Sequence, residues 1–307
     1  MTINKLNGLI AAPFTPFKEN GTLNLKQIKP LARLYRQNGV KGVFIAGTTG
    51  EGPSLSHKEK KILLQTWAAE KESGLKMIFT LGGTCIEEMQ ELAQMAKTHQ
   101  MDAVSILCPY YFRPPSLSDL VAFCKIIADT VPDIPFYYYH IPSLTHGNYS
   151  MLEFLKQAEG IIPNLAGIKY SYYDLFDFQS CAAYKEGKYN LLWGTDEALL
   201  SGLVAGADGA VGSTYNYAAP LYTKIIEAFN EGEIKKARKL QLKAVQMVQL
   251  LMKYGGAGAG KAFMKLIKAD CGWFRPPLRP LTEEKLEELR KDCEAIGFYD
   301  YCSRKIQ

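Results

Sequence analysis

The feature of this sequence that most limits its fold is a regular alternation of short apolar runs with stretches of helical periodicity. Each run has four to six residues and is followed by a polar or glycine-containing turn and then by a helix-like segment. One such segment is Glu87–His99, in which apolar residues recur at the spacing of one helix face. The runs predicted to form strands are Leu9–Phe14, Gly42–Ala46, Met77–Leu81, Ala103–Cys108, Phe136–His140, Ala166–Lys169, Leu191–Gly194 and Gly209–Gly212.

Eight alternating units of this kind favour one architecture. Strands that are connected through helices pair in parallel by right-handed crossovers. Eight units in a row predict a closed (β/α)8 barrel, or TIM barrel, and an open doubly wound sheet is the alternative. From about Ala218 onward the pattern is helical and contains no strand signal. We therefore predict a barrel domain over residues 1–230 and a helical extension over residues 231–307 that packs on it. The last helix is expected at Thr282–Ala295, with Thr282 as its N-cap.

Charge and cysteine usage argue against several classes of partner. The net charge of +5 comes from interleaved acidic and basic residues, which does not indicate binding to nucleic acid or to an anionic membrane. The sequence has neither the pattern of a signal peptide nor an apolar stretch long enough to cross a bilayer. The seven cysteines include no C-x-x-C pair, and the four histidines do not have metal-ligand spacing. We expect a cytoplasmic protein with reduced thiols and no metal site.

Lys169 closes the apolar run Leu165–Lys169 and is the candidate residue with the clearest chemistry. Lysine is seldom fully buried. Burial would lower its pKa and leave an amine that can form a Schiff base with a ketone. The alternative is a lysine that extends from the strand end to solvent, or that pairs with a carboxylate. This segment alone favours neither interpretation.

Polar residues follow many of the other predicted strands. In a (β/α)8 barrel the carboxyl ends of all strands meet on one face, where chemistry takes place. One lysine, several hydroxyls, two carboxylates and a glycine-rich turn are therefore predicted to converge, and they suit a small polyhydroxylated acid. The segments concerned are Gly47–Glu51, Pro109–Tyr111, Tyr137–His140, Lys169–Ser171, Gly194–Glu197 and Gly212–Asn216.

Each of these groups also has a structural interpretation. The turn Gly47–Gly50 could bind an anion through its backbone N–H groups, but taken alone an ordinary turn with threonine caps is favoured. Tyr139 either transfers protons beside a Schiff-base lysine or packs in the core. Asp196 and Glu197 either accept hydrogen bonds from substrate hydroxyls or cap the following helix. His140 should face away from Tyr139 and is expected to be structural.

The segment Gly255–Ala262 nearly matches the phosphate-binding pattern G-x-x-x-x-G-K-[ST]. Ala262 stands where that pattern needs a hydroxyl for magnesium, and no strand signal precedes the segment. We predict a connector between two C-terminal helices and no nucleotide binding.

With these residues in view, the chain resembles the pyruvate-dependent class I aldolases of the dihydrodipicolinate synthase / N-acetylneuraminate lyase superfamily. The resemblance runs from about Leu6 to about Gly297. Within the superfamily, FYYYHIPSLT and GSTYN are most similar to the N-acetylneuraminate lyase branch. The motifs that carry the resemblance are GTTGEG at Gly47–Gly52, YYHIP at Tyr138–Pro142, GIK at Gly167–Lys169, GTDE at Gly194–Glu197 and GADGAVGSTYN at Gly206–Asn216.

The resemblance implies a role for each candidate residue. Lys169 would form the Schiff base with the ketone, Thr48 and Thr49 would bind the pyruvyl carboxylate, and Tyr139 would orient that carboxylate and assist proton transfer. Tyr111 matches a tyrosine that in relatives reaches across a subunit interface, and relatives are usually homotetramers. No metal or organic cofactor is implied. The residues implied to bind the sugar hydroxyls are Ser171, Gly194, Asp196, Glu197 and Ser213.

One position bears on substrate choice. Dihydrodipicolinate synthases carry an arginine after the proline of the strand-five motif, whereas Leu144 stands there in this chain. A leucine cannot pair with a carboxylate, which favours a neutral aldehyde such as N-acetylmannosamine. The alternatives are another aldolase of the superfamily, acting on 2-keto-3-deoxy sugar acids or resembling dihydrodipicolinate synthase, and a non-catalytic sensor of sialic acid or pyruvate. The segment His146–Tyr149 departs from the usual Gly-Val and borders the expected site.

Overall fold

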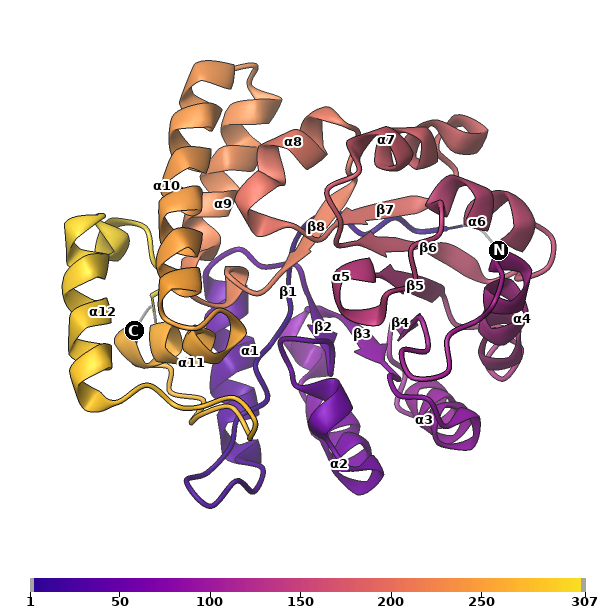
Figure 1. Ribbon diagram of the computed structural model, residues 1–307, viewed down its shortest axis with the longest axis horizontal. Helices are drawn as coiled ribbons and strands as arrows, with labels where there is room; N and C mark the ends of the chain where they lie inside the picture. Colours follow the sequence, from indigo (N-terminus) through magenta and orange to yellow (C-terminus); the bar gives the residue numbers. More distant parts are fainter. Residues whose placement is uncertain (1–2, 305–307) are drawn as a thin grey trace.

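The computed structural model describes residues 3–304, which form a closed barrel of parallel strands with helices around it (Figure 1). Each strand pairs with its sequence neighbours, and β1 pairs with β8 to close the barrel. The predicted barrel is therefore confirmed and the open sheet was wrong. The strands are β1 Gly8–Ala11, β2 Gly42–Ile45, β3 Lys76–Thr80, β4 Ala103–Leu107, β5 Phe136–His140, β6 Leu165–Tyr170, β7 Asn190–Trp193 and β8 Gly209–Gly212.

Helices alternate with the strands and form the outer layer. Helix α2 begins with a reciprocal capping box, in which Ser56 accepts from the Glu59 N–H and the Glu59 carboxylate accepts from the Ser56 N–H. The helices that follow the strands are α1 Ile28–Gln37, α2 His57–Ala68, α3 Ile86–Thr98, α4 Leu117–Ala128, the short α5 Pro142–Thr145, α6 Met151–Ala158, α7 Leu175–Ala183, α8 Leu199–Val204 and α9 Tyr215–Asn230.

The strands separate two apolar cores, one inside the barrel and one under the helices. Along β5, Tyr137 and Tyr139 point into the inner core, whereas Tyr138 packs in the outer core against Phe154. This alternation is the one predicted from the strand period, and it brings the Tyr139 phenol to the interior.

The C-terminal helices α10 Ile234–Lys253, α11 Ala257–Leu266 and α12 Glu283–Ala295 lie beside α9 and α1 at one side of the barrel (Figure 1). Thr282 caps α12 as predicted, because its hydroxyl accepts from the Lys285 N–H. Helix α9 begins at Tyr215, three residues earlier than the expected start of the helical region. The domain division at residue 230 stays a prediction.

The prediction of a connector at Gly255–Ala262 was wrong for most of the segment. Only Gly255 and Gly256 precede the helix, and residues 257–262 form the first turns of α11. Close packing explains why glycine occurs in this helix: a Cβ at Gly260 would lie 2.6 Å from the Phe14 ring. Tertiary contact therefore overrides the low helix propensity of glycine here.

Two expectations about the chain as a whole can be compared with the structure. None of the seven cysteines is in a disulfide within residues 3–304. Over the same residues, no helix is long and apolar enough to span a membrane, and no cluster of three or more His, Cys, Asp or Glu side chains could hold a metal ion.

Candidate active site

Lys169 lies on β6 with its side chain inside the barrel and only 4% exposed. Its Nζ is 3.9 Å from the centre of the Tyr139 ring and 4.1 Å from the centre of the Phe44 ring. Burial lowers the pKa of Lys169, while the nearby Tyr139 and Asp196 oppose that shift. The interpretation of a solvent-extended lysine was therefore wrong, and the environment favours the neutral, nucleophilic amine.

Tyr139 connects Lys169 to the turn after β2. Its hydroxyl lies 3.3 Å from Thr48 Oγ1, and its ring packs edge-on against Phe44 with centroids 5.4 Å apart. The ring is thus a core element, and the hydroxyl is a polar group held between the amine and the turn. This position fits a proton-transfer group beside a reacting imine.

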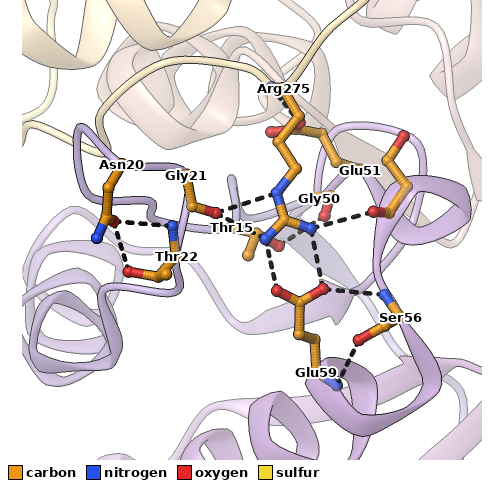
Figure 2. A network of polar contacts seen from close by, with 10 residues as sticks. Thr15, Asn20, Gly21, Thr22, Gly50, Glu51, Ser56, Glu59 and Arg275 are labelled. Carbon is orange, nitrogen blue, oxygen red and sulfur yellow. Dashed lines mark hydrogen bonds and ion pairs between the residues drawn. The ribbon is translucent and has the colours of Figure 1, made fainter.

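The turn Gly47–Gly52 is tightly closed by backbone hydrogen bonds. The Gly52 N–H donates to Gly47 O at 3.0 Å and the Glu51 N–H to Thr48 O at 3.0 Å. Gly52 has no room for a side chain, because a Cβ there would lie 1.9 Å from Ala46 O. In Figure 2, Thr15 donates from its hydroxyl to Gly50 O at 2.6 Å and so anchors the turn to the segment after β1.

The two threonines of this turn line the cavity and do not cap a helix. Ser56, not Thr48 or Thr49, caps α2, and the short helical turn Gly52–Ser54 has no side-chain cap. The favoured structural interpretation of the threonines was therefore wrong. Their hydroxyls remain available to an anion on the cavity side.

Asp196 follows β7 and is 6% exposed. Its Oδ2 accepts from the Thr214 N–H at 2.8 Å and from the Thr214 hydroxyl at 2.7 Å, and Ser213 Oγ lies 3.5 Å away. Burial raises the pKa of Asp196 to about 6, although the two Thr214 bonds act in the opposite direction. Asp196 caps no helix, so that interpretation was wrong; it ties the end of β7 to the end of β8.

Glu197 and Ser171 lie on the same wall of the cavity. The Tyr173 hydroxyl donates a hydrogen bond to Glu197 Oε1. A Cβ at Gly194 would lie 2.0 Å from Ser171 Oγ, so glycine is required for the close approach of these two loops. Sequence reasoning missed Tyr173, because nothing in the run of tyrosines distinguishes it from Tyr172.

These residues surround one cavity of about 310 Å³ at the carboxyl ends of the strands. It contains every predicted site residue except Tyr111: Thr48, Thr49, Tyr139, Lys169, Ser171, Gly194, Asp196, Glu197 and Ser213. The wall residues that the sequence did not indicate include Phe14, Ile141, Ser143, Tyr173, Leu251, Ala257, Gly260 and Phe274.

Tyr111 does not join this site. Its side chain is 76% exposed and packs edge-on against Phe112, with ring centroids 4.9 Å apart. It lines a separate hollow near Cys85 and Arg113. The expected convergence of this residue with the others is therefore not seen within one chain.

Two further expectations concern the loop after β5. Leu144 is 56% exposed and does not line the cavity, whereas its neighbour Ser143 does. None of the residues 146–149 lines the cavity, and Tyr149 donates from its hydroxyl to Pro114 O in the loop before α4. The segment His146–Tyr149 thus packs beside the site without entering it.

His140 lies outside the cavity, as expected for a structural residue. It is buried among the rings of Tyr138, Tyr170 and Tyr172. Burial lowers the pKa of His140 to about 4, so it is neutral at physiological pH.

Gly212 provides a stability test of this site. A Cβ at position 212 would lie 1.9 Å from Asp196 Oδ1, so Gly212→Ala forces the buried carboxylate away from Thr214. We expect a loss of roughly 1–3 kcal/mol in the free energy of unfolding, measured in urea. The matched control is Gly258→Ala in α11, where the nearest neighbouring atom would be 3.8 Å away and the helix should gain a few tenths of a kcal/mol or more. Equal stability of the two variants would contradict the packing described here.

The barrel and the buried lysine define a class of protein: a class I aldolase, a carbon–carbon lyase of the (β/α)8 type. The chain belongs to the dihydrodipicolinate synthetase family, which matches residues 5–296. It is 36% identical to the N-acetylneuraminate lyase of Rattus norvegicus, over 97% of this chain and 94% of that protein. The family resemblance drawn from the motifs is confirmed.

Solved structures agree with this assignment. The N-acetylneuraminate lyase of Proteus mirabilis is 40% identical and superposes with a TM-score of 0.93, covering 96% of this chain and all of that one. A sialic acid aldolase of Ruminococcus gnavus, solved as a catalytic lysine mutant, is 27% identical with a TM-score of 0.88 over 96% of each chain.

Proposed function

We propose that this chain cleaves N-acetylneuraminate reversibly to N-acetylmannosamine and pyruvate through a Schiff base on Lys169. The observation that carries the proposal is the buried Lys169 amine in contact with Tyr139, whose hydroxyl reaches Thr48 in the same cavity. The relatives named N-acetylneuraminate lyase, which match nearly the whole chain, support the choice of substrate.

The chemistry begins with attack of the neutral Lys169 amine on the ketone carbon of the open-chain substrate. Loss of water gives a protonated imine, which is an electron sink. The carbon–carbon bond next to the reacting hydroxyl then breaks, its electron pair moves toward the imine nitrogen, and the hydroxyl proton passes to Tyr139 or a group beside it. This step yields the aldehyde N-acetylmannosamine and an enamine. Protonation of the enamine carbon and hydrolysis of the imine release pyruvate and restore the amine.

The other groups of the cavity have distinct roles in this proposal. Thr48 and Thr49 bind the carboxylate of the ketoacid through hydroxyl and backbone N–H groups. The wall on the opposite side supplies acceptors and donors for the sugar hydroxyls, from Ser171, Gly194, Asp196, Glu197 and Ser213. Because the imine itself accepts the electron pair, the reaction uses no metal or organic cofactor.

The test of the proposal is pyruvate release from N-acetylneuraminate, run beside 2-keto-3-deoxygluconate under the same conditions. We expect release from the sialic acid at a higher kcat/KM than from the deoxy sugar acid. Release only from the deoxy sugar acid would move the assignment to another aldolase of the superfamily. If pyruvate formed no imine at all, a non-catalytic sensor would replace the enzyme.

Asp196 predicts a pH dependence for this reaction. With a pKa of about 6, its carboxylate ionises as the pH rises through 6, and its negative charge raises the pKa of Lys169. Asp196→Asn keeps an acceptor for Thr214 but removes that charge, so Lys169 should stay a free amine to lower pH. We expect the acidic limb of kcat/KM to move to lower pH in the variant. An unchanged limb would show that Asp196 does not influence the amine.

We further propose that the protein is a cytoplasmic homotetramer. The exposed aromatic pair Tyr111 and Phe112 supports an interface, because a contiguous apolar surface of this kind is unusual on a free subunit. Light scattering of the purified protein should give the mass of four chains. Tyr111→Ala with Phe112→Ala should give smaller species, and an unchanged mass would remove this pair from the interface.

A further inference from the structure

A second buried lysine lies outside the reaction centre. Lys261, on α11, is 0% exposed, and its Nζ donates to Glu51 Oε1 at 2.8 Å and to Trp273 O at 3.0 Å. The same Nζ lies 4.3 Å from the centre of the Phe17 ring and 4.9 Å from that of Phe274. A charge in such surroundings is tolerated only with a well-placed partner. Glu51 is that partner.

Glu51 directs both carboxylate oxygens to the C-terminal part of the chain. Oε1 accepts from Lys261, and Oε2 accepts from the backbone N–H of Arg275 at 2.8 Å. The Glu51 backbone has φ 57°, a left-handed conformation that is uncommon for a residue with a side chain. Figure 2 shows Glu51 beside Arg275 and Gly50 at this junction. Side-chain bonds from another part of the chain are what hold such a conformation.

The same residue ends the turn that carries the two threonines of the cavity. The Glu51 N–H donates to Thr48 O at 3.0 Å, so the position of Glu51 and that of the Thr48–Thr49 peptide are linked. Helix α11 also borders the cavity directly, through Ala257 and Gly260. One helix therefore supplies a wall of the site and, through Lys261, the anchor of its anion-binding turn.

We infer that Lys261 and Glu51 are positioning residues that set the affinity of the Thr48–Thr49 turn for the carboxylate of the ketoacid. The inference rests on the proposed function, since it takes a ketoacid as the ligand of this turn. Neither side chain is among those lining the cavity, so both act through the turn.

The variant that tests this is the double substitution Glu51→Gln with Lys261→Met. It removes both charges together, so no unpaired charge is left buried, and it nearly conserves volume. The amide oxygen of the new glutamine side chain can still accept from the Arg275 N–H, but the tie between the turn and α11 is lost. The probe is pyruvate, and the measurement is the rate of imine trapping by borohydride as a function of pyruvate concentration.

We expect the half-saturating pyruvate concentration to rise roughly 10- to 100-fold, because small displacements of binding groups have effects of this size. The maximal trapping rate should stay within about threefold, since Lys169 and Tyr139 are not displaced. This separation of KM from maximal rate is not expected from a general loss of stability.

Arg275→Met is the matched control. It removes a cation from the same segment, together with its bonds to Glu59 and to Gly21 O, and leaves the Glu51–Lys261 pair in place. We expect a lower melting temperature and an unchanged half-saturating concentration.

Three results would overturn the inference. If the double variant binds pyruvate like the parent, or if Arg275→Met raises the half-saturating concentration equally, the pair has no specific positioning role. If the maximal rate falls instead of the affinity, the pair acts on the chemistry and not on the turn. A parent protein that traps no pyruvate would overturn the proposed function, and this inference with it.

Discussion

Replacing Lys169 by alanine is expected to abolish pyruvate release from N-acetylneuraminate, with a fall in kcat of roughly 10⁴-fold or more. The reason is that the side chain supplies the only atom that bonds to the substrate in the proposed reaction. Its burial, with Nζ against the Tyr139 and Phe44 rings, leaves no comparable amine to take its place among the residues that line the cavity. The measurement is coupled detection of pyruvate at saturating substrate.

Lys169→Met serves as the control for folding. The methionine fills much of the same volume without a charge to desolvate, so its melting temperature should equal or exceed that of the parent. It should be as inactive as the alanine variant. Activity of either variant within about 100-fold of the parent would exclude Lys169 as the nucleophile.

Removing one oxygen atom at Tyr139 is expected to have the second largest effect. Tyr139→Phe keeps the ring against Phe44 but loses the hydroxyl near Thr48, and we expect kcat/KM to fall by about 10²- to 10⁴-fold, as for loss of a general acid–base group. The protein should fold normally, because the inner core is unchanged. Steady-state kinetics with N-acetylneuraminate measures the loss.

Tyr137→Phe is the control for this substitution. Tyr137 lies on the same face of β5 but deeper in the barrel, and its hydroxyl donates to Asn190 Oδ1 at 2.8 Å. Its loss should lower stability by about 1 kcal/mol and leave kcat/KM within a few-fold of the parent. Equal kinetic effects of the two substitutions would mean that Tyr139 contributes only to packing.

Much of the site could be predicted because it lies on strand ends. Short apolar runs indicate the order of the strands, and barrel closure then brings Thr48, Tyr139, Lys169 and Asp196 to one face. The period of two along β5 separates Tyr139 from Tyr138 without a structure. Strand ends are predicted less accurately: the apolar pattern indicates one strand over Leu9–Phe14, but β1 ends at Ala11, since buried apolar residues continue beyond the last ladder bond.

The parts that were missed depend on contacts between distant segments. Leu251, Ala257 and Gly260 belong to helices far along the chain, and no local pattern indicates that they wall the cavity. The sequence predicts a connector around Lys261 because glycine-rich segments usually form loops, whereas packing on Phe14 selects a helix. The pairing of the buried Lys261 with Glu51 is likewise invisible in sequence, since the two residues are 210 positions apart.

The most direct test of the central claim is to locate the Schiff base. The protein is incubated with N-acetylneuraminate, reduced with borohydride and digested, and the modified lysine is identified by mass spectrometry. We predict a reduced pyruvyl adduct on Lys169 alone, together with release of N-acetylmannosamine. An adduct on any other lysine, including the buried Lys261, or no adduct while pyruvate is still released, would contradict the account.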